Sequence, residues 1–145
     1  VETQSLPAVT PVYLGMGATR SSFEVLTELV TDETGMMAAT IPVPDWATSD
    51  RTHYFVVVDV YFRPLAVSGG FQVTESDGSL SRRGVILRDG SCLMLQEEGE
   101  LQELYALTGD VLETLSPGQD VWVEGALTNT DACGAGPSLE VTRVR

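Results

Sequence analysis

The residues that could do chemistry are few and lie far apart in the sequence. His53 is the one histidine, and neither cysteine lies near it, so we expect a structural or surface role for it rather than catalysis. None of the serines stands in the G-x-S-x-G pattern of a nucleophile elbow. The chain also lacks a P-loop and a complete dinucleotide-binding fingerprint, because the pattern at Gly15 and Gly17 has no third glycine. These absences predict that the protein is not an enzyme.

Acidic residues are abundant, but their spacing builds no site. The pairs at 32–33 and 97–98 fall in expected turns, where carboxylates are solvated, whereas acid–base catalysis needs a buried carboxyl group with a raised pKa. No EF-hand loop is present, and the only weak candidates for binding calcium are residues 31–35 and 45–50. We assign no metal ligand and no cofactor.

The two cysteines, Cys92 and Cys133, could form one disulfide, which would place the protein in an oxidising compartment. The alternative is a pair of buried free thiols in a cytosolic protein. We expect the disulfide, and therefore a secreted or cell-surface protein.

Charge limits the class of partner. The chain carries 21 acidic and 8 basic residues, a net charge of −13, and every basic residue is an arginine. This charge repels phosphate backbones, so we expect no nucleic acid as a partner. No apolar run has the roughly 18 residues of a membrane span. Because the chain begins with Val1 rather than Met, we expect an end left by processing or cutting.

The elements that would position these residues are strands. In residues 1–76, strand-like runs cover 11–15, 23–30, 36–43, 53–61 and 67–74, and the run at 53–61 has the apolar middle of a central strand. Residues 75–81 are polar and read as a boundary. Residues 77–145 show strands at 84–88, 91–96, 101–107, 120–127 and 139–144. A short helix at 111–115 is expected to be capped by Asp110, with Glu113 completing a capping box.

This order of three strands, a short helix and two strands resembles the OB-fold, a five-stranded Greek-key barrel. The resemblance is closer to small exported bacterial OB-like domains of unknown function. It is carried by these residues: Gly84, Cys92, Tyr105, Ala106, Leu107, Gly109, Leu115, Pro117, Gly118, Val121, Val123, Gly125 and Cys133.

Residues 11–76 resemble the later part of a bacterial immunoglobulin-like sandwich. The resemblance lies in TDETG, IPVPDWA, YFVVVDVY and FQVTE. A complete domain of that type has about seven strands; this stretch has fewer, so its first strands look absent, and we expect an open sheet edge near residues 12–15. The predicted fold class is all-β: an incomplete immunoglobulin-like β-sandwich over 1–76, then a small five-stranded OB-like barrel with one short helix over 77–145.

Two sets of residues could make contacts. Arg82, Arg83 and Arg88 form a local basic spot on the first barrel strand. Tyr105 and Trp122 are the aromatics that could face a ligand on the OB-like surface, although covering the core is the expected role of Trp122.

We therefore expect a non-enzymatic structural or interaction protein of the extracellular space or cell surface. Its partner would be a protein, including other copies of itself in a homo-oligomer or filament built by β-strand exchange at the open edge. The alternative is a module that binds a glycan or peptide on the OB-like face.

Overall fold

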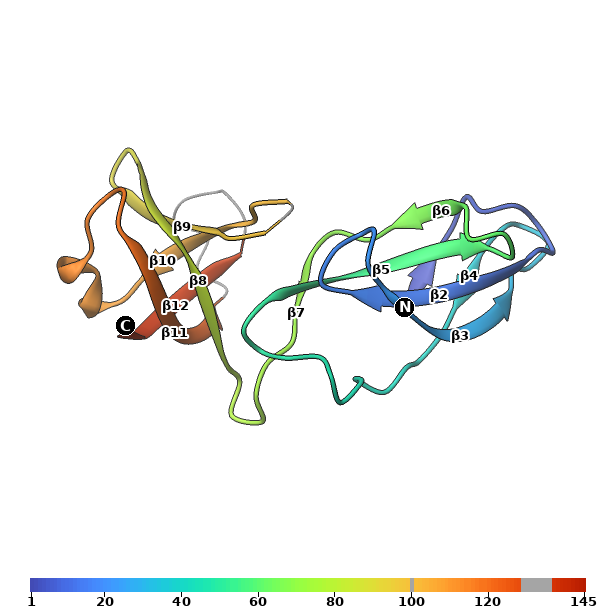
Figure 1. The fold of residues 1–145 in the computed structure, drawn as a ribbon, viewed down its shortest axis with the longest axis horizontal. Helices are drawn as coiled ribbons and strands as arrows, with labels where there is room; N and C mark the ends of the chain where they lie inside the picture. Colours follow the sequence, from blue (N-terminus) through green and yellow to red (C-terminus); the bar gives the residue numbers. More distant parts are fainter. Residues whose placement is uncertain (100, 129–136) are drawn as a thin grey trace. The chain divides into compact units, whose positions relative to one another are not determined.

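Strands make up most of this protein (Figure 1). The computed structural model describes residues 1–99, 101–128 and 137–145. Within them the one helical element is a 3-10 helix, so the predicted all-β class is confirmed. The chain forms two compact units: one contains Val1–Ala47 and His53–Phe71, and the other contains Thr48–Thr52 and Gln72–Arg145.

The first unit is built on an antiparallel sheet. Its strands are β1 (Glu2–Thr3), β2 (Pro11–Gly17), β3 (Glu24–Val30), β4 (Met37–Ala38), β5 (Thr52–Asp59), β6 (Pro64–Val67) and β7 (Phe71–Gln72). The sheet runs in the order β3-β2-β5-β6, and β7 also pairs with β5. β1 and β4 form a separate two-stranded ribbon.

β5 is a central strand, as its sequence predicts. Val56 and Val58 are buried on one face and Val57 on the other, and the strand has β2 on one side and β6 on the other. A core of Leu6, Val12, Leu14, Met37 and Val57 packs between the sheet and the segments around it.

The expected open edge near residues 12–15 is wrong. β2 pairs with both neighbours: Leu14 lies opposite Thr27 of β3 and opposite Val57 of β5. The outer strands of this sheet are β3 and β6. The return strand expected at 36–43 is also shorter than predicted, because only Met37–Ala38 pairs, ahead of Pro42 and Pro44, which cannot donate into a ladder.

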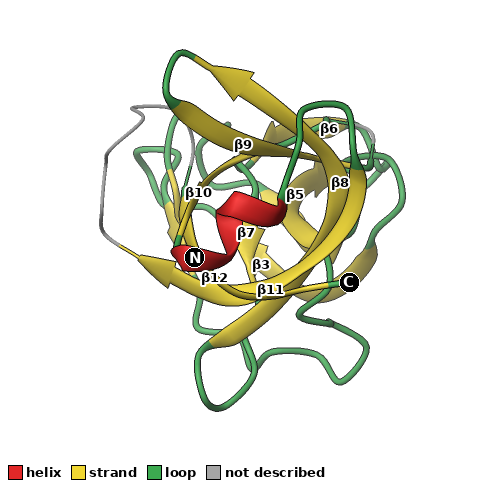
Figure 2. Ribbon diagram, turned by 90° about the vertical axis from the view of Figure 1, so that its left-hand side faces the viewer, coloured by secondary structure: helices red, strands yellow, loops and turns green. Residues whose placement is uncertain are grey.

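The second unit is a closed barrel. Its elements are β8 (Ser79–Asp89), β9 (Cys92–Glu97), β10 (Leu104–Thr108), the 3-10 helix η1 (Asp110–Thr114), β11 (Asp120–Thr128) and β12 (Ser138–Val144). The ring closes in the order β10-β12-β11-β8-β9, in which β10 and β12 are parallel and the other pairs are antiparallel. Figure 2 shows the ring with η1 (red) across its opening, and Val111 and Leu112 of η1 pack on the core.

Closure depends on one long curved strand. β8 pairs with β11 over its first half and with β9 over its second, and Gly84 lies where the two pairings overlap. A Cβ atom at Gly84 would lie 2.0 Å from the carbonyl oxygen of Gln96, so the strands can approach this closely only at a glycine. β8 already begins at Ser79, inside the polar stretch expected to separate the two modules.

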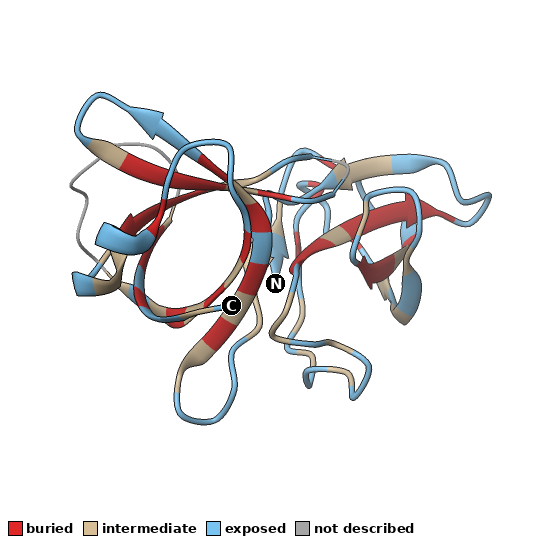
Figure 3. Ribbon diagram, turned by 60° about the vertical axis from the view of Figure 1, so that its left-hand side comes forward, coloured by how far each residue is buried: buried red, intermediate tan, exposed pale blue. Residues whose placement is uncertain are grey.

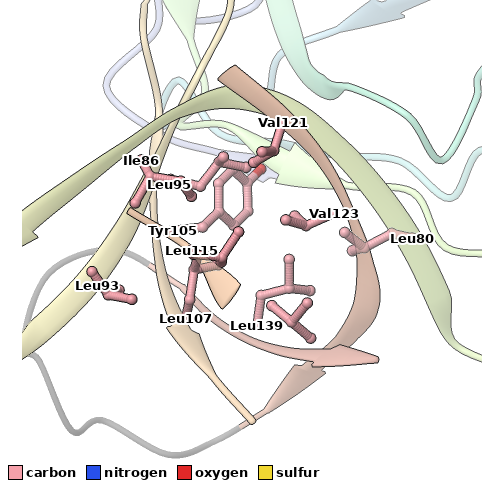
Figure 4. Packing of buried hydrophobic residues seen from close by; sticks show 11 residues of the cluster. Leu80, Ile86, Leu93, Leu95, Tyr105, Leu107, Leu115, Val121, Val123 and Leu139 are labelled. Atoms are coloured by element: carbon pink, nitrogen blue, oxygen red, sulfur yellow. The ribbon is translucent and has the colours of Figure 1, made fainter. Parts of the chain in front are cut away.

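The barrel interior is filled by side chains. The buried cluster contains Leu80, Ile86, Leu93, Leu95, Tyr105, Leu107, Leu115, Val121, Val123, Leu139 and Val141 (Figure 4). Figure 3 shows that buried residues follow the strands and exposed residues the turns.

The capping prediction for the short helix is wrong. Gly109 is the N-cap, with φ 119°, and no side chain caps η1. Asp110 is instead the first helical residue. Among the described residues, no helix has the length and hydropathy needed to cross a membrane.

Candidate interaction site

The turn between β5 and β6 exposes three consecutive apolar side chains. Val60 is 41%, Tyr61 75% and Phe62 60% exposed. Single exposed apolar residues are common, but a contiguous group on one turn is typical of interaction surfaces. Arg63 follows them, with its side chain 72% exposed. We refer to residues 60–63 as the aromatic tip.

Asp59 holds the aromatic tip in one conformation. Its Oδ1 accepts hydrogen bonds from the backbone N–H of Tyr61 and of Arg63, both at 2.9 Å, and its Oδ2 accepts from Nε of Arg63 at 2.6 Å. The backbone closes the turn as well, because Phe62 N–H donates to the Asp59 carbonyl at 2.9 Å. The tip is therefore ordered before any partner arrives.

These bonds also set the protonation of Asp59. Burial raises the pKa of Asp59. The hydrogen bonds from the backbone and side chain of Arg63 and from the backbone of Tyr61 lower the pKa by more than burial raises it. The pKa of Asp59 is therefore below its ordinary value of 3.8, and the carboxylate is ionised at neutral pH.

Phe62 adopts a backbone conformation that aromatic residues rarely take. Its φ is 61°, in the left-handed region, which costs roughly 1–2 kcal/mol for a residue with a Cβ atom. Its ring stacks on Tyr13 of β2, with ring centroids 5.5 Å apart and planes at 19°. This stack and the Asp59 bonds offset the strain, and they keep Phe62 displayed rather than folded inward.

A groove lies beside the aromatic tip, where the chain leads into β2. Its volume is about 490 Å³, within the range of small-ligand pockets. The lining residues are Pro7, Thr10, Pro11, Asp59, Val60, Tyr61, Arg63, Pro64 and Leu65. Figure 1 shows the β5–β6 turn next to the start of β2. We call this feature the tip groove.

Arg63 supplies the charge at the tip groove. Its guanidinium carbon lies 5.2 Å from the centre of the Tyr61 ring, a cation–π arrangement. Nε is engaged by Asp59, whereas the two terminal nitrogens of this largely exposed side chain have no hydrogen-bond partner among the described residues. They can donate to a carboxylate brought by another molecule.

The barrel contains a buried polar cluster, in which Thr52 N–H and Oγ1 contact the two carboxylate oxygens of Glu97 at 2.9 and 2.5 Å. Oγ1 of Thr52 also lies 2.5 Å from the Tyr105 hydroxyl, which accepts from Nε of Arg82 at 3.1 Å. Nη1 of Arg82 donates to the Ser49 carbonyl at 2.7 Å. Thr52 donates the single hydrogen of its hydroxyl to Glu97, so Tyr105 must donate to Thr52.

This cluster corrects three sequence predictions. Glu97, which was expected to be solvated in a turn, is 7% exposed and is the last residue of β9. Arg82 is completely buried and ion-paired with Glu97, with 3.4 Å between Nε and Oε1, so it cannot belong to a basic surface patch. Tyr105 is also completely buried, so it cannot face a ligand. Their role is to join residues 48–52 to the barrel within the second unit.

Two of the remaining predicted contact residues lie together, because Arg83 of β8 is directly opposite Trp122 of β11. Arg83 is half exposed and pairs with Asp120 at 3.4 Å, while Arg88 is exposed near the end of β8. Trp122 is half-buried on β11 between the inward-facing Val121 and Val123.

His53 packs against aromatic side chains, and the acidic turn at 31–35 is held by its own hydrogen bonds. His53 is 1% exposed, and its ring centroid lies 6.1 Å from that of Trp46 and 6.2 Å from that of Phe71. Hydrogen bonds from the Thr34 side chain and from backbone N–H groups lower the pKa of Asp32 and close the turn at 31–35. Within the described ranges, no group of three His, Cys, Asp or Glu side chains is arranged to hold a metal ion.

The disulfide stays a prediction. Cys92 begins β9, and Cys133 lies outside the described residues.

The aromatic tip was missed at the sequence level. Residues 53–61 were assigned to one strand, interrupted by Arg63 and Pro64, so the exposure of Tyr61 and Phe62 was not anticipated. The available signal was an apolar run that continues past Asp59 directly into a turn containing proline.

No protein-family model, no curated protein and no solved structure matches this chain. The resemblances to OB-like and immunoglobulin-like domains therefore stay predictions, and the account of function depends on the geometry of the aromatic tip.

Proposed function

We propose that this protein is a non-catalytic interaction module that binds a partner protein through the aromatic tip and the tip groove. The observation that carries the proposal is a pair of exposed aromatic residues, Tyr61 and Phe62, on a turn that Asp59 fixes. Pre-ordering lowers the entropy that binding must remove, and tyrosine and arginine are the residues enriched at the centres of interfaces.

The shape and lining of the tip groove favour an extended partner segment. Pro7, Pro11 and Pro64 provide rigid apolar walls, and Tyr61 provides an aromatic one. Grooves of this kind accept proline-containing segments, whose polyproline conformation exposes apolar side chains and is already ordered before binding. The partner segment in this proposal is therefore extended, apolar and proline-containing.

An extracellular or cell-surface setting is part of the proposal. It is supported by the expected Cys92–Cys133 disulfide and by the acidic surface. We do not propose a ligand site on the OB-like face, because Tyr105, one of the two aromatics expected there, lies in the core.

The test is an NMR titration of the ¹⁵N-labelled chain with a synthetic peptide that alternates proline and leucine. Binding is expected to shift the backbone amides of residues 8–10, 60–63 and 65, and Tyr61→Ser is expected to weaken it about tenfold. Leu127→Ala, which removes a comparably apolar side chain that is 39% exposed on β11, is the matched control and should bind as the wild type does. An absence of shifts at these amides, or equal binding by Tyr61→Ser, contradicts the proposal.

A further inference from the structure

We infer that the occupant of the tip groove is a second copy of this chain, which inserts residues 42–46 and so joins copies head to tail. This inference rests on the proposed function, since it names the partner of the same groove. Its starting point is a second exposed apolar feature on the first unit, which we call the proline segment (residues 42–46).

The proline segment has the chemistry that the tip groove accepts. It reads Pro-Val-Pro-Asp-Trp and belongs to no strand or helix. Val43 is 65% exposed and Trp46 39% exposed. The prolines on either side of Val43 fix its backbone in an extended conformation and present its side chain outward.

Charge matches at the same place. Asp45 is exposed and lies two residues after Val43. A turn closed by the hydrogen bond from Ala47 N–H to the Pro44 carbonyl, at 3.0 Å, displays Asp45 directly after the Val43–Pro44 pair. The tip groove is lined mainly by apolar residues, together with Asp59 and the exposed Arg63 that it pairs with. An apolar side chain followed closely by a carboxylate is complementary to this lining, because the guanidinium of Arg63 has donors that Asp59 does not use.

The two surfaces are different parts of the first unit. None of residues 42–46 lines the tip groove. An interface between unlike surfaces leaves one groove and one proline segment unused in every dimer, so further copies can add. This arrangement gives open chains of copies without strand exchange. It does not require an open sheet edge at β2, which β3 covers.

Two physical consequences distinguish this contact. A segment of five residues can cover only a small area, so we expect a weak association, in the class below about 1,200 Å² of buried surface. Each copy carries a net charge of −13, so the copies repel one another at low ionic strength. Because the contact itself is mainly apolar, salt that screens this repulsion should strengthen the association rather than weaken it.

The test is sedimentation equilibrium of the full chain over a concentration series at low and high salt. We expect the wild-type average mass to rise with concentration, and more so at high salt. Tyr61→Ser removes the groove contact and Val43→Ser removes the segment contact; each should weaken association at least about tenfold alone. Both side chains are mostly exposed, so both variants should fold, and Leu127→Ala is again the control.

An equimolar mixture of the two variants gives the decisive result. Tyr61→Ser keeps an intact proline segment and Val43→Ser keeps an intact groove, so the mixture should form dimers and stop there. A mixture that associates no better than either variant alone overturns the inference, as does a wild type that stays monomeric or whose association neither substitution affects.

A peptide separates this inference from the proposed function. A synthetic peptide of residues 41–47 should shift the amides of residues 60–65 and compete with self-association. If it fails while the proline–leucine peptide still binds at these amides, the second copy is the wrong partner and the interaction module stands. If both peptides fail, both ideas fall.

Discussion

Nε of Arg63 donates a hydrogen bond to Oδ2 of Asp59 at 2.6 Å, four residues away across the β5–β6 turn. The same carboxylate also accepts the backbone N–H groups of Tyr61 and Arg63. One acidic side chain therefore fixes the turn, orients the arginine and keeps two aromatic rings exposed. If the tip is an interaction surface, Asp59 is the residue that prepares it.

The first prediction concerns Asp59 itself. Asp59→Ala removes both carboxylate oxygens that the turn uses as acceptors, so the amide hydrogens of Tyr61 and Arg63 should exchange faster, as measured by NMR. Asp59→Asn keeps one oxygen that can accept from the backbone, and should have a smaller effect. Equal exchange rates in the wild type and Asp59→Ala would contradict the role assigned to this carboxylate.

The second prediction is a pH dependence at the tip. The pKa of Asp59 is below 3.8 in the folded protein, so its stabilising bonds are fully present above about pH 5 and are lost as the pH falls through the folded pKa. The amide shifts of Tyr61 and Arg63 should titrate with a midpoint below 3.8, and Asp59→Asn should abolish that titration. A midpoint above 3.8 would show that the hydrogen bonds do not outweigh burial.

The third prediction concerns the buried ion pair of the barrel. Glu97→Met leaves the Arg82 guanidinium buried without its carboxylate and should destabilise the protein by about 3–5 kcal/mol in urea unfolding. Replacing both residues by methionine removes both charges, so the double variant should be more stable than the single one. Arg83→Gln, which removes a half-exposed ion pair on the same strand, is the control and should have the same urea midpoint as the wild type. A double variant that is less stable than Glu97→Met would refute this account.

The Tyr105 hydroxyl offers a related prediction. Tyr105→Phe removes the acceptor for Arg82 and the donor to Thr52 without changing the ring in the core, so it should cost about 1–3 kcal/mol. Thr52→Val should cost a similar amount, and the two losses should not add, because both variants break the same hydrogen bond. Fully additive losses would show that the hydroxyls act separately.

The barrel was the most predictable part of the fold. The turn at Asp89 and Gly90, the stop at Pro117 and Gly118, and the clean alternation of Val121 and Val123 are local signals, and they predicted the strands in the right order. The burial of Arg82 was not predictable in the same way. Its partners, Glu97 and Ser49, lie 15 and 33 residues away in sequence, and an arginine without visible partners is normally assigned to the surface.

The first unit shows the same division between local and distant information. The central position of β5 followed from its apolar middle, but the neighbours of β2 did not follow from its own residues, so the expected open edge was misplaced. The aromatic tip was missed because apolar residues in a run are ordinarily counted into the strand. Only the turn held by Asp59 places them outside it.

The prediction of an extracellular or cell-surface protein depends on the expected disulfide between Cys92 and Cys133. A Cys92–Cys133 bridge would close a loop of about 40 residues and contribute roughly 3–4 kcal/mol in the chain-entropy model. Reducing agent should therefore lower the unfolding midpoint, and replacing both cysteines by serine should have the same effect in its absence. Two titratable thiols in the denatured, unreduced chain would remove the bridge and the argument for an extracellular setting.

The central claim is that the aromatic tip is where this protein meets its partner, and one NMR measurement tests it most directly. The ¹⁵N-labelled wild type is recorded as its own concentration is raised, and then at low concentration with the proline–leucine peptide. The account predicts shifts at residues 60–65 in both series, with residues 42–47 moving only in the first. Amides at 60–65 that stay fixed in both series would contradict it.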